Sequence, residues 1–128
     1  MDITYGDCIH ALVPNASFNI DNDDYSSLVW EDNNYTQPTE EEILVKKSEL
    51  ESQFPMKILR EQRDFLLLET DKYSLPDFPH SSEIIRQSWL TYRQELRDIT
   101  TTQTPQMDMN FNLINVTWPT DPNGNTGF

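Results

Sequence analysis

The chain has 128 residues, of which 22 are Asp or Glu and 9 are Lys or Arg, so its formal net charge is −13. This length predicts one small domain with a modest core. The excess negative charge would repel a phosphate backbone, which argues against binding to nucleic acid or to an anionic membrane. The single cysteine, Cys8, excludes an internal disulfide and fits a reducing compartment.

The charge is distributed unevenly along the chain. Residues 1–54 contain 12 acidic and 2 basic side chains, whereas residues 55–99 contain 8 acidic and 7 basic ones. The composition predicts three segments: an N-terminal helix and β-hairpin module at 1–38, a helical region at 39–99 with a break near Pro55, and an extended polar tail at 100–128.

The first segment predicts a short helix followed by a hairpin. In "DITYGDCIHALVP", Tyr5, Ile9 and Leu12 share one helical face, and Pro14 would end the helix. The next stretch, "ASFNIDNDDYSSLVWED", is rich in aromatic and β-branched residues at both ends. It predicts two strands around residues 18–20 and 28–30, joined by an Asn- and Asp-rich turn.

The stretch "QPTEEEI" predicts the start of a long helix. Thr39 and Glu42 have the spacing of a capping box, in which each side chain bonds the backbone N–H of the other residue. The helix should run towards Phe54. Pro55 would then stop it, kink it or open a second helix.

Two apolar helical stripes follow. Leu59, Leu66 and Tyr73 recur at heptad spacing, and the first stripe is widened by Ile58, Phe65 and Leu68. Ser81 or Ser82 would cap the next helix, whose apolar face contains Ile85, Trp89, Tyr92, Leu96 and Ile99. The loop between the stripes, which contains two prolines, is short enough for the two helices to form an antiparallel helical hairpin.

The tail from Thr100 onwards is rich in Thr, Asn, Pro and Gly and cannot form a core of its own. We expect one strand within residues 111–118. Order elsewhere in the tail would need contacts with the domain itself or with a partner chain. The fold class predicted from all these elements is α+β.

No pattern in the sequence indicates an enzyme, and we expect no cofactor or small-molecule substrate. His10 and His80 are far apart, and Cys8 and His10 would point in different directions on a helix. A calcium loop starting at Asp21 would place Ser26 where glycine is needed. No Cys and His spacing suits zinc, and no glycine-rich phosphate loop is present.

The helix "QSWLTYRQELRDI" combines aromatic residues with arginines and allows two interpretations. Trp89, Tyr92 and Leu96 can pack against the preceding helix as core. Arg93 and Arg97 can form a ridge beside them, and aromatics next to arginine are also favoured at protein interfaces. Both roles can hold together, so we expect a partner-binding set of five residues: Trp89, Tyr92, Arg93, Arg97 and Trp118.

Several motifs resemble the phage tail assembly chaperone family of small tail-fibre assembly proteins. The resemblance covers roughly residues 55–121 and is carried by "PMKILREQRDFLLLETD", "LPD", "SWLTYRQELRDI" and "NVTWPTDP". The family usually has an aromatic directly after its Asp, whereas here Lys72 follows Asp71 and Tyr73 comes next. The spacer before Trp118 and Pro119 is also long. The N-terminal stretch, from "ALVPNASFNI" to "PTEEEI", is similar to a module found ahead of this motif in phage tail-region proteins.

The resemblance implies a non-enzymatic role in phage tail assembly, with a tail-fibre, other tail or baseplate protein as partner. One hypothesis is a transient chaperone that acts in the host cytoplasm and is absent from the finished particle. The alternative is a structural component that remains in the virion tail, baseplate or fibre attachment.

Overall fold

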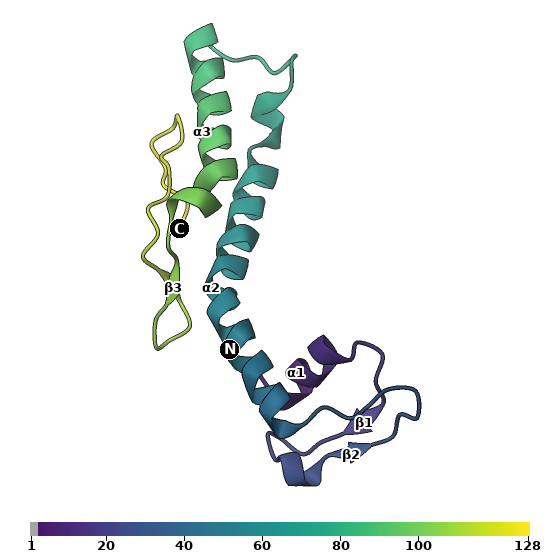
Figure 1. Ribbon diagram of the computed structural model, residues 1–128. Coiled ribbons are helices and arrows are strands. Elements are labelled where there is room, and N and C mark those ends of the chain that lie inside the picture. The colour runs from purple at the N-terminus through teal and green to yellow at the C-terminus, as the bar shows by residue number, and fades with distance from the viewer. Residues whose placement is uncertain (1–2) are drawn as a thin grey trace. The chain divides into compact units, whose positions relative to one another are not determined.

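The computed structural model describes residues 3–128 and confirms the predicted α+β fold, with long helices and short antiparallel hairpins (Figure 1). The chain divides into two compact units, the first ending at Phe54 and the second spanning Pro55–Phe128. The boundary lies inside a long helix, α2 (Glu40–Glu69). Each unit has its own buried apolar cluster and is described separately.

The first unit contains the predicted helix and hairpin. Helix α1 (Tyr5–Leu12) is capped by Thr4, whose hydroxyl accepts a hydrogen bond from the Asp7 N–H at 3.1 Å. Strand β1 (Phe18–Asn19) pairs antiparallel with β2 (Val29–Trp30). The rings of Phe18 and Trp30 stack across this pair with centroids 6.1 Å apart. The connection between the strands includes a 3₁₀ helix, η1 (Tyr25–Ser27).

The core of the first unit joins α1 to the start of α2. Cys8, Ile9 and Ile43 are fully buried there. The predicted capping box fixes where α2 begins, because the Glu42 N–H donates to Thr39 Oγ1 at 3.1 Å and the Thr39 N–H donates to Glu42 Oε1 at 3.2 Å.

The break predicted near Pro55 is absent from the secondary structure, because α2 continues through this residue. Proline has no N–H to give to the Glu51 carbonyl, and such a residue inside a helix costs about 3 kcal/mol. Good helix formers on both sides, "SELESQ" and "MKILREQ", offset this cost. The proline therefore marks the boundary between the compact units without ending the helix.

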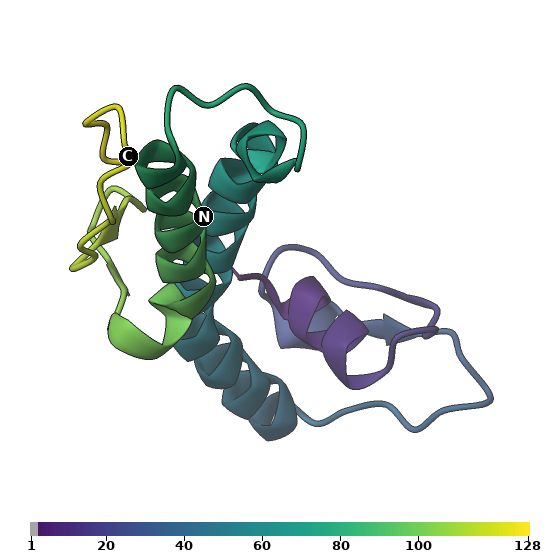
Figure 2. The same ribbon diagram turned by 90° about the horizontal axis from the view of Figure 1, so that it is seen from above.

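In the second unit, α2 and α3 (Glu83–Thr102) form the predicted antiparallel hairpin (Figures 1 and 2). They are linked by a 3₁₀ helix, η2 (Asp71–Ser74), and a proline-containing loop. Ser82 caps α3, accepting a hydrogen bond from the Ile85 N–H at 3.2 Å. The buried cluster consists of Trp89, Tyr92 and Leu96, packed against Leu66, Leu67, Tyr73, Ile85 and Trp118.

The apolar stripe of α2 is narrower than predicted. Leu59 is fully buried and Leu66 is half-buried, but Leu68 is 71% exposed and Phe65 is 52% exposed. The predicted widening by Phe65 and Leu68 is therefore wrong. At 100° per residue, Leu68 lies on nearly the opposite side of the helix from Leu66, which faces the core.

The tail contains a hairpin of β3 (Gln106–Met107) and β4 (Leu113–Ile114), so the predicted strand is shorter than expected. Further along, Trp118 packs against the core of the unit, and its ring lies 5.3 Å from that of Phe128. The N–H of Thr117 also donates to Gln103 Oε1 at 2.8 Å. Contacts within the second unit therefore order the tail.

Two turns in the tail share one sequence pattern and one geometry. In "DMNFN" and "DPNGN", the Asp carboxylate accepts hydrogen bonds from the backbone N–H groups two and four residues later, at 2.8–3.0 Å. The fourth residue has positive φ in both turns, 61° at Phe111 and 89° at Gly124. Asp and Asn favour such turns because their side chains bond nearby backbone, which explains order in a polar segment.

Within residues 3–128, no helix is both long and apolar enough to cross a membrane. The same part of the chain shows no group of three or more His, Cys, Asp or Glu side chains arranged to hold a metal ion.

Replacing Trp89 tests the core of the second unit. Trp89 is 4% exposed and stacks on Tyr73 with ring centroids 3.9 Å apart. We expect Trp89→Ala to lower the free energy of unfolding by about 3–5 kcal/mol, measured by urea denaturation followed by circular dichroism. Ile84→Ala, on the same helix but at a side chain 78% exposed, is the control and should change it by less than about 0.5 kcal/mol. Equal losses in the two variants would contradict the assignment of Trp89 to the core.

Candidate functional site

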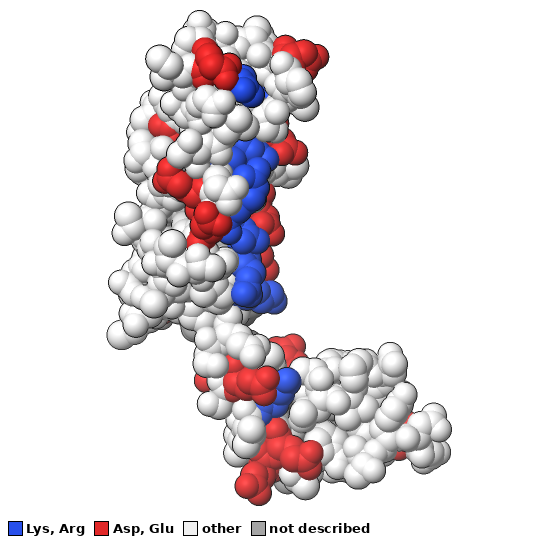
Figure 3. All heavy atoms as spheres, turned by 45° about the horizontal axis from the view of Figure 1, so that its top comes forward, with Lys and Arg blue, Asp and Glu red and all other residues white. Residues whose placement is uncertain are grey.

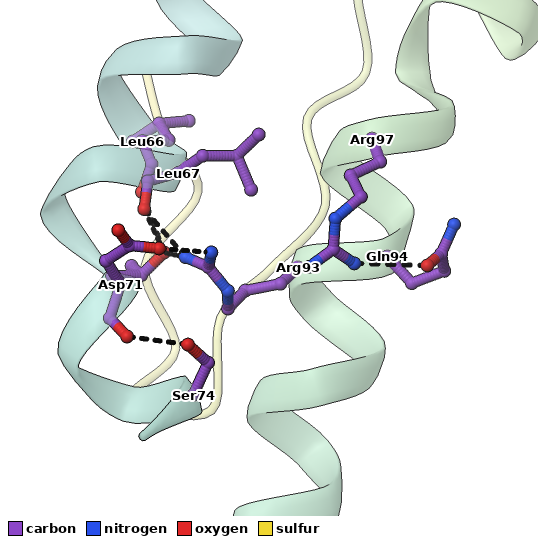
Figure 4. A network of polar contacts seen from close by, with 8 residues as sticks. Leu66, Leu67, Asp71, Ser74, Arg93, Gln94 and Arg97 are labelled. Atoms are coloured by element: carbon purple, nitrogen blue, oxygen red, sulfur yellow. Dashed lines mark hydrogen bonds and ion pairs between the residues drawn. The ribbon is translucent and has the colours of Figure 1, made fainter.

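Arg93 connects the two helices of the hairpin (Figure 4). Its residue is 6% exposed, and its Nη1 donates to the Leu67 carbonyl at 2.7 Å and to Thr70 Oγ1 at 2.8 Å. Its Nη2 forms an ion pair with Asp71 Oδ1 at 2.6 Å. One guanidinium on α3 thus holds the last turn of α2 and the first residue of η2.

The position of Arg93 suits the electrostatics of a helix end. The last carbonyls of a helix lack intrahelical partners and carry partial negative charge, which a cation satisfies. Thr70 bonds the Leu66 carbonyl through both its N–H at 3.1 Å and its hydroxyl at 2.7 Å. Arg93 and Thr70 together complete this C-terminus, while the buried Nε of Arg93 has no hydrogen-bond partner in the protein.

An aromatic group lies beside this ion pair. The rings of Tyr73 and Trp89 are stacked at an interplanar angle of 15°, and Tyr92 meets Trp89 edge-on. His80 Nε2 lies 2.9 Å from the Tyr73 carbonyl oxygen, which holds the loop against η2. The aromatic residue that follows Asp71 in this chain is Tyr73, two positions later, and it stacks on Trp89.

The five residues predicted to bind a partner have different environments. Trp89, Tyr92 and Arg93 are buried within the second unit, Trp118 is half-buried and Arg97 is exposed. Arg97 donates to Gln94 Oε1 at 3.1 Å on its own helix. Direct binding of a partner by any of the five stays a prediction, and only Arg97 is fully available on the surface of the chain.

The arginines of α3 do not form one ridge. Arg86 donates two hydrogen bonds to the Glu83 carboxylate, at 2.7 and 2.8 Å, whereas Arg93 points into the hairpin. Spacing along α3 predicts the ridge but does not show which carbonyl or carboxylate of α2 and η2 each guanidinium reaches. Sequence reasoning therefore missed the pair of Arg93 with Asp71, although both residues belong to the motifs named above.

The pKa values of Glu83, Tyr92 and Cys8 are shifted from their ordinary values. Hydrogen bonds from Arg86 and then Gln87 lower the pKa of Glu83 to about 2. Burial, and secondarily the charge of Asp121, raises the pKa of Tyr92. Burial followed by the nearby Asp7 charge raises the pKa of the Cys8 thiol, which disfavours the nucleophilic thiolate. His10 lies on the same helix as Cys8, exposed and with its ring 5.0 Å from Phe18.

Comparison with known proteins places these features in a family. A family model described as phage tail assembly chaperone protein matches residues 56–123, which is more than half of the chain. The match begins one residue inside the second unit and contains the Asp71–Arg93 pair, the Trp89 stack and Trp118. No curated protein and no solved structure matches the chain.

Removing the guanidinium of Arg93 tests its structural role. Arg93→Met keeps the apolar stem but leaves the Leu67 carbonyl and Thr70 hydroxyl without this donor, so the free energy of unfolding should fall by roughly 1–3 kcal/mol. Arg97→Met removes an exposed guanidinium from the same helix and should change it by less than about 0.5 kcal/mol. Chemical denaturation measures both, and a loss for Arg97→Met as large as that for Arg93→Met would contradict the assignment.

The pKa of Glu83 gives a pH-dependent expectation. Because its pKa in the folded chain is about 2, below the ordinary 4.5, its contact with Arg86 is complete above pH 4.5 and is lost as the pH falls through 2. Side-chain NMR titration should place Glu83 near 2 in the natural chain and closer to 4.5 in Arg86→Gln. A titration of Glu83 that is unchanged by Arg86→Gln would show that the arginine is not the cause.

Proposed function

The chain belongs to the phage tail assembly chaperone family, and we propose that it acts without catalysis, binding a tail or fibre subunit while the phage tail is assembled. The observation that carries this proposal is the coincidence of the family match with a compact unit that has its own core. The role of the family would then belong to this folded unit.

The second unit combines a fixed frame with an apolar and cationic surface. Eight large apolar side chains remain exposed on it: Phe65, Leu68, Leu75, Ile84, Met109, Phe111, Ile114 and Phe128. Exposed apolar surface on a chain with a net charge of −13 suits a soluble protein that covers the aggregation-prone end of another subunit.

The five predicted partner-binding residues would then act in two ways. Trp89, Tyr92 and Arg93 are buried, so they would act by keeping α3 fixed against the end of α2. Arg97 and the accessible part of Trp118 would touch the partner directly. This division follows from burial, because a buried side chain can reach another protein only if the hairpin opens.

A lasting place in the virion is the alternative. An ordered polar tail would favour it if a virion neighbour were needed to hold the tail. Here Trp118, Gln103 and Phe128 fix the tail within the second unit, so its order needs no neighbour. With the family match, this favours the transient role, and we propose that the protein acts in the host cytoplasm during assembly.

Co-expression tests the function. The tagged chain is produced with each tail, baseplate and fibre protein of the phage that encodes it, one pair at a time. We expect one of these proteins to co-purify and to gain soluble yield, and Trp118→Ala to weaken the association. Tyr35→Ala, at an exposed aromatic of the first unit, is the matched control.

Mass spectrometry of purified particles then separates the two hypotheses. A transient chaperone should be absent from the particles. A stoichiometric amount would overturn this proposal in favour of a structural component. If no tail protein associates with the chain, both hypotheses, the transient chaperone and the structural component, are contradicted.

A further inference from the structure

The basic side chains of this acidic protein fall into two groups. Acidic residues outnumber basic ones by 22 to 9, so any cation has ample opportunity to pair. Five cations do so within the described residues: Lys46, Lys47, Arg63, Arg86 and Arg93. Four others have no carboxylate within 4.0 Å in residues 3–128: Lys57, Arg60, Lys72 and Arg97.

Three of these four cations belong to one face of the second unit. Lys57, Arg60 and Arg63 recur every three residues along α2, and Arg97 is one helical turn beyond Arg93 on the antiparallel α3. Since Arg93 reaches the Leu67 carbonyl, the next turn of α3 comes level with the turn of α2 that contains Arg63. Figure 3 shows Lys and Arg gathered in a column along this unit.

We use the name basic column for a set of four residues that includes Arg63 and leaves out Lys72: Lys57, Arg60, Arg63 and Arg97. Lys57, Arg60 and Arg97 are exposed, and Arg63 pairs only with its chain neighbour Asp64, at 3.0 Å. None of them holds elements of the fold together, a role that belongs to Arg93. Exposed guanidinium groups without carboxylate partners are well suited to bind another protein's carboxylates in bidentate fashion.

We propose that the basic column docks a short carboxylate-rich segment of the tail protein that this chain binds. The proposal rests on the proposed function and adds the chemistry of the partner. From Lys57 to Arg63 the column spans about 9 Å of helix, at 1.5 Å per residue, which matches roughly three residues of an extended chain. A segment with two or three closely spaced Asp or Glu side chains would therefore fill it.

Two other occupants are less favoured by the charges. A nucleic acid carries a continuous row of phosphates, which would extend beyond the column and meet the exposed carboxylates of Glu61 and Asp64 on a chain with a net charge of −13, whereas a segment with two or three carboxylates needs to contact only the column. A second copy could offer its own acidic residues 1–54, but two such chains repel each other overall. Both occupants remain distinguishable outcomes of the experiment.

The experiment compares two variants with the same change in charge. The column variant combines Lys57→Gln, Arg60→Gln and Arg97→Gln, and the control combines Lys46→Gln, Lys72→Gln and Arg86→Gln. Glutamine keeps the helix propensity of lysine and arginine. The three substituted cations of the column are exposed and have no carboxylate partner within the described residues, so thermal unfolding of the column variant should match that of the natural chain.

The probes are three fluorescein-labelled ligands: a ten-residue peptide of alternating Glu and Gly, its Gln and Gly counterpart, and a ten-nucleotide oligothymidylate. Fluorescence anisotropy at 50 mM NaCl should show the Glu peptide binding the natural chain and the control, with roughly tenfold weaker binding to the column variant. Binding should also weaken at 300 mM NaCl.

Four results would overturn the proposal. They are no binding of the Glu peptide to the natural chain, equal binding to all three proteins, tighter binding of the oligothymidylate, and a salt-sensitive dimer in sedimentation equilibrium that only the column variant loses. The last two would identify a nucleic acid and a second copy, respectively, as the occupant.

Co-purification separates this proposal from the proposed function. If a tail protein associates normally with the column variant, the proposed function is supported and the docking role of the basic column is contradicted. If the chain binds the Glu peptide through the column but associates with no tail protein, the proposed function is contradicted. A tail protein is then also ruled out as the occupant of the column.

Discussion

The second unit depends on one buried guanidinium. Two helices packed through an apolar stripe can slide or rotate with little change in buried area, because hydrophobic contact is not directional. Arg93 removes this freedom, since its fork fits the Leu67 carbonyl, the Thr70 hydroxyl and the Asp71 carboxylate in one arrangement only. The stack of Tyr73 on Trp89 and the docking of Trp118 depend on this register.

This arrangement explains how a family motif can be rich in residues typical of interfaces and still be largely internal. Trp, Tyr and Arg are common at protein surfaces that bind partners, and the same properties make them suitable for a small core that needs orientation as well as apolar area. In this chain the motif builds a rigid support, and in the proposed function the surface left around it would provide the chemistry for recognition.

Local sequence signals predicted much of the fold, because each depended on a few neighbouring residues. The Thr39–Glu42 capping box and the short N-terminal helix are of this kind. The course of α2 through Pro55 could not be predicted in the same way, since it depends on the balance between one lost hydrogen bond and many helix-forming neighbours. The exposure of Phe65 and Leu68 depends on how much of the surface of α2 is covered by α3, which the spacing of apolar residues along α2 does not show.

The sequence named several residues of the candidate site, Trp89, Tyr92 and Arg93 among them, but not how they are arranged. Which arginine turns inwards depends on where α2 ends, and spacing along α3 carries no information about that. The repeated "D-x-N-x-N" pattern in the tail was a readable signal of ordered turns, since both copies place a left-handed residue at the same position.

Pro55 has a consequence for how the protein comes apart. The Glu51 carbonyl receives no N–H from Pro55, so this turn has one hydrogen bond fewer than a regular helix, and it lies at the boundary of the two units. Local unfolding that starts in one half of α2 can stop at this turn before it reaches the other half. Pro55 therefore limits how far local unfolding of one half of α2 spreads into the other.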